Sequence, residues 1–169
     1  MASAADRRLF WTTALAVVAL DFVTKLAAEA ALLLTPGVPV IGDWFQLRLV
    51  YNRGAAFGLH VGPYSRWVFF AVAVVAVYVL NRMSHTSPPG DRLRQLSLGL
   101  VAGGAAGNLI DRIRSARGVV DFLDVGIGSL RWPTFNVADI AVSCGGIALA
   151  VVLWREDQRR AEAESAPAA

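Results

Sequence analysis

The sequence has very few cysteines and histidines, and this scarcity excludes several kinds of site. Cys144 is the only cysteine, so no intrachain disulfide can form. The two histidines, His60 and His85, fall in separate loops and lack the spacing of metal ligands. This argues against a metallopeptidase with paired histidines. We therefore expect neither a metal nor another cofactor.

Charged residues are scarce as well. Only 17% of the 169 residues are charged, whereas 56% are hydrophobic, a balance too apolar for a soluble domain of this length. The net charge of +3 comes largely from arginines at the chain ends and in loops, without a basic stripe interleaved with aromatic residues. Such a distribution fits anionic lipid head groups better than nucleic acid. We therefore predict a membrane protein that binds no nucleic acid.

Four apolar stretches are each close to the length of about 20 residues that a helix needs to cross a bilayer. We predict membrane-spanning helices over residues 9–34, 64–83, 95–113 and 137–154. These helices leave no room for a second domain, so residues 1–154 are expected to form one unit. Residues 155–169, rich in Arg, Glu and Ala, are expected to form a disordered cytoplasmic tail.

Residues 35–63, between the first two helices, contain a segment with the alternation of a β-strand. Its apolar side consists of Phe45, Leu47, Leu49 and Tyr51. Glycines and a proline around residues 127–132 indicate a second extended piece, of the kind that a hairpin contains, before the last helix. The predicted fold is a mainly α membrane protein with four transmembrane helices and a small extracytoplasmic β-sheet region. We expect the sheet to lie on the membrane and to hold the substrate there.

An even number of membrane crossings places both termini on one side. Arginines flank both ends of the chain, which favours the cytoplasm for that side. Many arginines also fall on the other side, so this count is weak and the orientation rests partly on the resemblance described below.

The N-terminus also imitates a cleavable secretory signal, because Arg7 and Arg8 precede an apolar run. Asp21 and Lys25 would be unusual before a cleavage site, and a retained helix explains them better. Each would add roughly 2.5 to 3.5 kcal/mol to insertion at a helix centre. Their separation of four residues allows them to pair on one face, either as a self-contained ion pair or as part of a functional site.

The third apolar stretch combines small residues with polar ones. Gly103–Gly107 forms a smooth strip that allows another helix to approach closely. Asn108 and Arg112 follow and share a helix face near its end. Arg112 either extends to the membrane interface or orients a substrate carbonyl or a carboxylate, and composition alone does not decide between these roles.

Two aspartates flank the start of the last helix. Asn136 and Asp139 fit an N-cap and an acid in the first turn, whereas Asp121 follows two β-branched residues just outside the third helix. The two carboxylates can meet at one membrane face. Two close carboxylates do not both ionise easily, so one keeps a proton while the other activates water, which is sufficient for peptide hydrolysis. We expect Asp124 to be a loop acid unless the sheet brings it inward.

Five motifs follow one another along the chain. They are Asp21 with Thr24 and Lys25; Asn52, Gly54, Ala55, Ala56 and Phe57; GGAAGNLIDR from Gly103; VVDF from Val119; and FNVAD from Phe135. In this order they resemble the lipoprotein signal peptidases (signal peptidase II), a family of membrane aspartic peptidases. The resemblance covers nearly the whole chain up to Trp154.

The resemblance implies an enzyme of the bacterial inner membrane that cleaves prolipoproteins immediately before a cysteine carrying diacylglyceryl. It assigns catalysis to Asp121 and Asp139, near the extracytoplasmic face. The substrate-binding or supporting residues that it implies are Asp21, Lys25, Asn52, Gly54, Asn108, Arg112 and Asn136. Membrane lipids are expected partners, globomycin is expected to inhibit the enzyme, and we expect a monomer.

Two alternatives assign other chemistry to the same residues. A small proton-coupled transporter also fits four helices with an intramembrane acid, but it gives no role to Asp121 and Asp139. A Ser/Lys peptidase would use Lys25, the only lysine, with Ser97 or Ser143 as nucleophile. Neither serine lies in a supporting motif.

Overall fold

The computed structural model describes residues 1–54 and 61–165, and within them the chain forms helices in the four predicted regions. The helices are α1 (Ala4–Leu32), α2 (Ser65–Thr86), α3 (Arg92–Arg114) and α4 (Val137–Ser165). In this described part, two helical segments, Gly62–Thr86 and Val137–Ser165, are long and apolar enough to cross a membrane. The crossing of all four helices therefore stays a prediction. Residues 55–57 of the second motif, and His60, lie outside the described residues.

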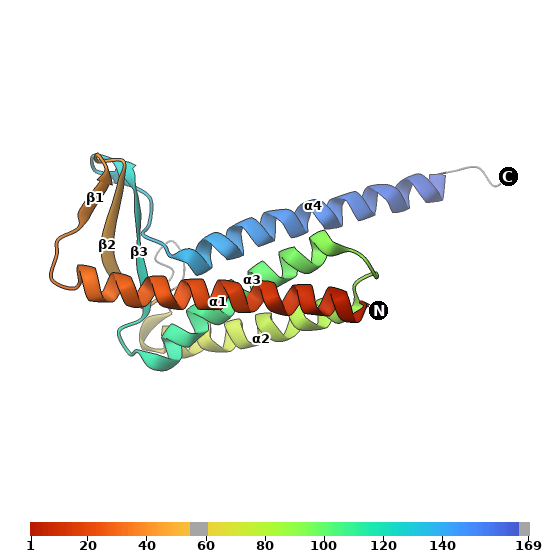
Figure 1. Ribbon diagram of the computed structural model, residues 1–169, viewed down its shortest axis with the longest axis horizontal. Helices are drawn as coiled ribbons and strands as arrows, with labels where there is room; N and C mark the ends of the chain where they lie inside the picture. The colour runs from red at the N-terminus through yellow and green to blue at the C-terminus, as the bar shows by residue number, and fades with distance from the viewer. Residues whose placement is uncertain (55–60, 166–169) are drawn as a thin grey trace.

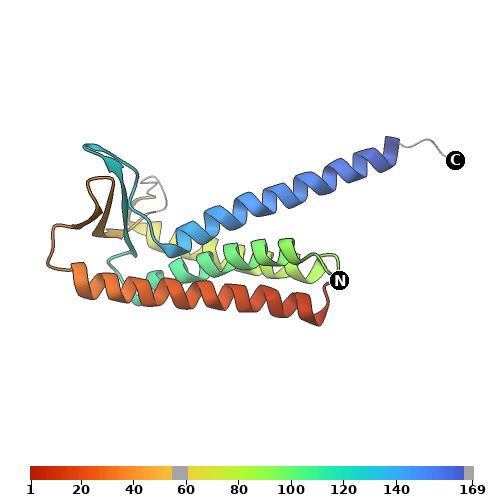
Figure 2. The same ribbon diagram turned by 45° about the horizontal axis from the view of Figure 1, so that its top comes forward.

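The four helices run side by side, with a small sheet at one end of the bundle (Figure 1). Helix α3 packs against each of the other three helices. Helix α4 diverges from the bundle and extends past it, as the turned view in Figure 2 also shows. Both termini lie at the end opposite the sheet, as expected for an even number of helices.

The small residues of α3 are its packing surface, which confirms the predicted role of the glycine strip. A Cβ on Gly103 would lie 2.7 Å from the carbonyl oxygen of Ala14 in α1. A Cβ on Gly104 would overlap the carbonyl oxygen of Ala138 in α4. Neighbouring glycines of α3 therefore let two different helices approach its backbone.

Gly104→Ala is expected to lower the melting temperature, because the added methyl must push Ala138 and the start of α4 away. Overpacking of this kind typically costs about 1 to 3 kcal/mol. Gly146→Ala is the matched control, because a Cβ at Gly146 meets no atom within 4 Å. Thermal unfolding in detergent checks both variants. Equal melting temperatures for the two would contradict the packing explanation.

The chain beyond residue 154 is helical, so the predicted disordered tail is wrong for residues 155–165. Two contacts explain the continuation of α4: Glu156 pairs with Arg94 of α3, and Arg160 bonds Glu156 one turn away at 2.7 Å. Ala, Glu and Arg are also good helix formers. Residues 166–169 lie outside the described part of the chain.

The sheet joins segments that are distant in sequence. Its strands, in spatial order, are β1 (Val38–Ile41), β2 (Phe45–Asn52), β3 (Val119–Ile127) and β4 (Leu130–Arg131). All neighbouring strands are antiparallel, and Val50 in β2 lies opposite Asp121 in β3. The hairpin of β3 and β4 confirms the second extended piece predicted before the last helix. The pairing of β2 with β3 brings the loop after α1 against the chain that leaves α3.

The side chains of β2 alternate, and one set of them packs on the end of α1. Leu47, Leu49 and Tyr51 pack against a core that includes Ala28 and Leu32 at the end of α1. The predicted alternation is therefore confirmed, but its apolar side packs on α1. Leu47 is partly buried in this contact with α1, and the expectation that this side holds the substrate against the membrane stays a prediction.

Candidate active site

Asp121 lies in the buried strand β3, and its side chain is only 2% exposed. Two amide groups donate to its carboxylate oxygens. Asn52 Nδ2, at the end of the neighbouring strand β2, lies 3.1 Å from Oδ2, and Asn136 Nδ2 lies 2.7 Å from Oδ1. Strand pairing and the segment before α4 therefore fix this carboxylate from two sides.

Asp139 lies in the first turn of α4, and it closes a reciprocal cap with Asn136. The Asp139 N–H donates to Asn136 Oδ1 at 3.0 Å, and the Asn136 N–H donates to Asp139 Oδ2 at 3.1 Å. The predicted N-cap is thus confirmed. The other oxygen, Oδ1, accepts from Nδ2 of Asn108 in α3 at 2.8 Å.

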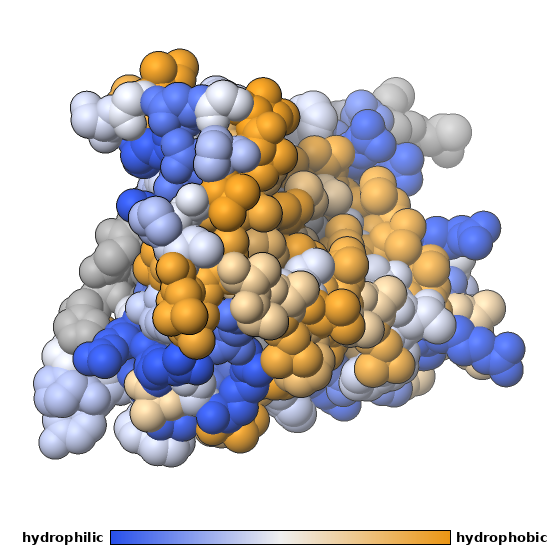
Figure 3. All heavy atoms as spheres, turned by 60° about the vertical axis from the view of Figure 1, so that its left-hand side comes forward, coloured by the Kyte–Doolittle hydropathy of each residue, from blue (hydrophilic) through white to orange (hydrophobic). Residues whose placement is uncertain are grey.

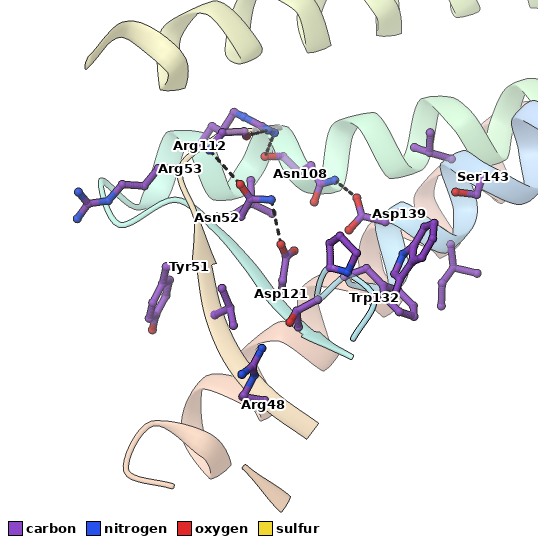
Figure 4. Close-up of a pocket in the computed structure, with 18 of the residues that line it drawn as sticks. Arg48, Tyr51, Asn52, Arg53, Asn108, Arg112, Asp121, Trp132, Asp139 and Ser143 are labelled. Carbon is purple, nitrogen blue, oxygen red and sulfur yellow. Dashed lines mark hydrogen bonds between the residues drawn. The ribbon is translucent and has the colours of Figure 1, made fainter. Parts of the chain in front are cut away.

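The two aspartates line one cavity of about 910 Å³, and Figure 4 shows them at the same end of the bundle. The amides of Asn108 and Asn136 connect them, because Asn136 Nδ2 also lies 3.1 Å from Asn108 Oδ1. Each carboxylate thus accepts from one member of this amide pair. Two acids separated by 18 positions in sequence therefore line one cavity.

The surroundings of Asp121 favour its protonated form. Burial, and after it the charge of Asp139, raise the pKa of the Asp121 carboxyl to about 7. The amide hydrogen bonds from Asn52 and Asn136 act in the opposite direction, since they stabilise the ionised form. The cavity therefore combines one acid that retains its proton near neutral pH with a second carboxylate.

A buried ion cluster lies behind the cavity, between α1 and α3. Lys25 Nζ lies 2.8 Å from Asp21 Oδ2, 2.8 Å from Asp111 Oδ2 and 2.9 Å from Asn108 Oδ1. The predicted pairing of Asp21 with Lys25 is confirmed. Asp21 Oδ1 also accepts the N–H of Ala138 at 2.9 Å, so the cluster ties α1 to the start of α4.

Lys25 orients the amide that serves Asp139. An ammonium group only donates hydrogen bonds, so its contact fixes the oxygen of the Asn108 amide on the Lys25 side. The Asn108 NH₂ group is then directed toward Asp139. Asp21 and Lys25 do not line the cavity, which makes them supporting residues in this geometry.

Asp111 was not among the predicted site residues, although the structure places it at the centre of the ion cluster. It also accepts from Arg114 Nε at 2.9 Å and from the Val120 N–H at 3.1 Å. The sequence did contain a signal, because Asp111 is an acid near the end of an apolar helix and three residues after Asn108. Its role depends on an ion pair with Lys25 of another helix. The periodicity of one helix does not show such a pair.

Arg112 holds the backbone beside the cavity. Its Nη1 donates to the Asn108 carbonyl at 3.0 Å, and its Nη2 donates to the Gly54 carbonyl at 3.2 Å. Asn52 Oδ1 accepts the N–H of Gly54 at 2.9 Å. The predicted residues Asn52, Gly54, Asn108 and Arg112 therefore lie together on the cavity wall, whereas Asn136 is fully buried beside it.

Asp124 is not the loop acid that we expected, because it lies in β3 with a side chain 1% exposed. Arg48 Nε lies 3.1 Å from its Oδ2, and Arg131 Nε lies 2.9 Å from its Oδ1. Strands on both sides of β3 supply these arginines, so the sheet itself brings the acid inward. Asp124 does not line the cavity, which separates it from Asp121 and Asp139.

One wall of the cavity is largely apolar, and sequence reasoning did not identify it. Helix α4 contributes Ile140, Val142, Ser143 and Cys144, and Trp132 precedes the helix. Figure 4 shows Trp132 and Ser143 beyond Asp139 as seen from Asp121. Within an apolar helix these residues have no distinguishing pattern. The sequence alone therefore did not identify them as residues that line the cavity.

The geometry is unfavourable for a Ser/Lys pair. Lys25 is fully buried and bound by two carboxylates, which is unsuitable for a general base. Ser97 is buried and donates to the Leu93 carbonyl at 2.8 Å. Ser143 lines the cavity, but Lys25 does not.

Comparison with known proteins shows the family of this chain. Residues 13–155 match the family model of Signal peptidase (SPase) II. The lipoprotein signal peptidase of Syntrophomonas wolfei is 42% identical over 153 residues, covering 89% of this chain and 95% of the relative. That of Halothermothrix orenii is 39% identical over 150 residues, covering 89% of this chain and 98% of the relative.

Two solved structures of a bacterial membrane enzyme have the same fold. One, determined at 2.3 Å resolution, gives a TM-score of 0.78 with 27% identity and covers 88% of each chain. The other, at 1.9 Å, gives 0.74 with 29% identity and covers 84% of this chain and 90% of the other. These similarities give no support to a transporter.

Proposed function

Because this chain belongs to the signal peptidase II family of membrane aspartic peptidases, which remove signal peptides from prolipoproteins, we propose that it cleaves diacylglyceryl-modified bacterial prolipoproteins. The cut precedes the lipid-bearing cysteine. The observation that carries the assignment of the active site is the sharing of one cavity by Asp121 and Asp139. The apolar wall along α4 suits a substrate whose lipid remains in the bilayer.

In the proposed mechanism the two aspartates share one proton. The ionised carboxylate accepts a proton from a water molecule, and the oxygen of that water attacks the scissile carbonyl carbon. The protonated carboxyl meanwhile donates a hydrogen bond to the carbonyl oxygen. The tetrahedral intermediate then collapses, and the leaving nitrogen receives a proton from the pair. The raised pKa of Asp121 supports Asp121 as the carboxyl that starts with the proton. The pair titrates as a unit, so this describes the predominant form.

The supporting residues divide into two groups. Asn52, Asn108 and Asn136 donate to the carboxylates and act as positioning residues. Arg112 and Gly54 border the cavity and are proposed to hold the substrate backbone. Asp21 and Lys25 act through Asn108 and the start of α4.

For the membrane arrangement we propose that residues 1–154 form one domain whose four helices cross the bacterial inner membrane. Both termini lie in the cytoplasm, and the sheet and the active site lie at the extracytoplasmic face. Pairing of Lys25 with Asp21 and Asp111 supports this placement, because it offsets the cost of burying these charges. The enzyme acts as a monomer in contact with membrane lipids.

The proposed substrate is tested with detergent-purified protein and one prolipoprotein in two forms, with and without diacylglyceryl on the cysteine. We expect cleavage immediately before the cysteine in the modified form and little in the other form. Mass spectrometry of the products identifies the cut, and globomycin should block it. Equal cleavage of the unmodified form would show that the lipid is not recognised.

The pH dependence of cleavage tests the shared proton. The pKa of Asp121 is raised to about 7, so the proton stays bound below this pH and is lost above it. The rate is therefore expected to fall as the pH rises through about 7, approaching a tenfold decrease per pH unit. Asn52→Ala removes an N–H that stabilises the ionised form, so it should move this decrease to higher pH. A rate that is constant from about pH 6 to pH 9 would count against the mechanism.

A further inference from the structure

A second cavity, of about 410 Å³, lies between the start of α2, the end of α3 and the start of β3. Arg53, Arg66 and Arg112 line it, and the described residues of its lining include no acid. It shares Asn52, Arg53 and Arg112 with the active-site cavity, so the two are neighbours. In Figure 4 the Arg53 side chain points away from Asp121 and Asp139.

The positive charge of this cavity is poorly neutralised. Among the described residues, no carboxylate forms an ion pair with Arg53, Arg66 or Arg112. The sequence of residues 55–60 contains neither Asp nor Glu. Arg112 is attracted electrostatically by the nearby acids of the first cavity, which leaves Arg53 and Arg66 as the arginines that no carboxylate balances here.

Arginines outside the cavity at the same end of the molecule behave differently. Arg117 bonds Glu29 at 3.0 Å and lies over the ring of Tyr51 at 4.2 Å. Arg131 bonds the buried Asp124 at 2.9 Å. Pairing with a carboxylate is therefore common at this end, and the cavity departs from that pattern.

The Arg66 guanidinium is held by two hydrogen bonds and retains further N–H donors. Its Nε donates to the Arg112 carbonyl at 2.7 Å, and its Nη2 donates to the Ile113 carbonyl at 3.1 Å. A guanidinium has five N–H donors, so these two bonds leave others for a ligand. Arg66 also lies in the first turn of α2, where the helix dipole disfavours a cation. Stability of α2 therefore does not explain this residue.

We propose that this cavity binds the phosphate group of an anionic phospholipid, of which phosphatidylglycerol is a simple example. Guanidinium groups match the geometry of phosphate oxygens. A lipid is favoured over free phosphate because Trp67 lines the cavity and is 58% exposed, as is typical at a membrane interface. Val68 and Val72, next along α2, are also exposed and provide an apolar surface for acyl chains.

This proposal uses the membrane placement given above, but it does not depend on the peptidase mechanism. A head group in the cavity would touch the outer side of the wall that carries Asn52 and Arg112. The phospholipid would therefore lie beside the bound prolipoprotein.

The test is native mass spectrometry of the full chain in detergent, titrated with phosphatidylglycerol, with phosphatidylcholine of the same acyl chains, or with inorganic phosphate. We expect tighter binding of phosphatidylglycerol. Arg53→Gln combined with Arg66→Gln should weaken it by about tenfold or more. Arg117→Gln is the matched control, because it removes one charge at the same end without altering the cavity lining, and it should retain the affinity.

Three outcomes would overturn the proposal. They are unchanged phosphatidylglycerol affinity in the double variant, an equal loss in Arg117→Gln, and competition by inorganic phosphate at the concentration of the lipid. Arg53→Gln alone guards against a folding artefact, since Arg53 is exposed and holds no helix end. It should show part of the loss. Because the readout is lipid binding, the outcome is independent of whether the prolipoprotein is cleaved.

Discussion

Asp121→Asn and Asp139→Asn are each expected to fold and to reduce prolipoprotein cleavage to background, a decrease of at least about 10³-fold. General acid–base groups typically contribute about 10² to 10⁴-fold each, and in a shared-proton pair the loss of either member removes both roles. Asparagine has nearly the same shape as aspartate but does not accept the proton from water. Single-turnover cleavage of a lipid-modified prolipoprotein measures the effect.

Ser97→Ala and Ser143→Ala are the controls for this experiment. Ser143 lines the same cavity, so its replacement tests whether any change there abolishes activity. Ser97 is buried in α3 and bonds within its own helix. Both should retain cleavage. Full activity in either asparagine variant would refute the two-aspartate mechanism.

Thermal stability shows whether Asp121→Asn is folded, and its direction follows from the raised pKa. The folded protein holds the Asp121 proton more tightly than the unfolded chain does. This contribution to stability is therefore complete below the unfolded pKa and is lost as the pH rises through about 7. Above pH 7 the wild type buries an ionised carboxylate, whereas Asp121→Asn does not. The variant should melt at the same or a higher temperature there, as expected when an active site is strained for function.

Lys25→Met is expected to destabilise the protein by about 3 to 5 kcal/mol, the usual effect of removing one partner from a buried ion pair. Lys25 is 1% exposed and is the cation that lies between Asp21 and Asp111. Without it, Asp21 has no remaining ion partner among the described residues. The start of α4 should then loosen as well, because Asp21 holds the N–H of Ala138. Thermal unfolding in detergent and the yield of folded protein measure the loss.

The double variant Asp21→Asn with Lys25→Met distinguishes lost charge balance from lost packing. Asp111 keeps an ion pair with Arg114 at 2.9 Å, so removing the charge of Asp21 leaves no unpaired acid in the cluster. We expect the double variant to regain part of the stability that Lys25→Met loses. A double variant less stable than the single one would show that charge balance is not the reason for the cluster.

The sequence predicted what depends on neighbours along the chain. Apolar runs located the helices, strand alternation located β2, and the N-cap at Asn136 followed from residue type. The assignment of Asp121 and Asp139 came from their position at two element ends and from the family motifs. Both residues line one cavity, and their catalytic role stays a prediction.

What the sequence did not predict depends on partners from distant segments. Asp111 and Asp124 are ordinary acids in sequence, and they become buried because Lys25, Arg48 and Arg131 arrive from other elements. The helical continuation of α4 was missed for the same reason, since Arg94 of α3 pairs with its extension. The periodicity of one helix or strand does not predict ion pairs with residues of another element.

The contact between the first and last helices determines when, during its own synthesis, this protease can begin to work. Asp21 accepts a hydrogen bond from the N–H of Ala138, and Asp139 is the next residue. On the proposed mechanism, a ribosome that has released the chain only as far as β3 has delivered Asp121 without Asp139. On that mechanism the unfinished polypeptide lacks one of the two acids, and cleavage requires that the start of α4 has docked beside α1.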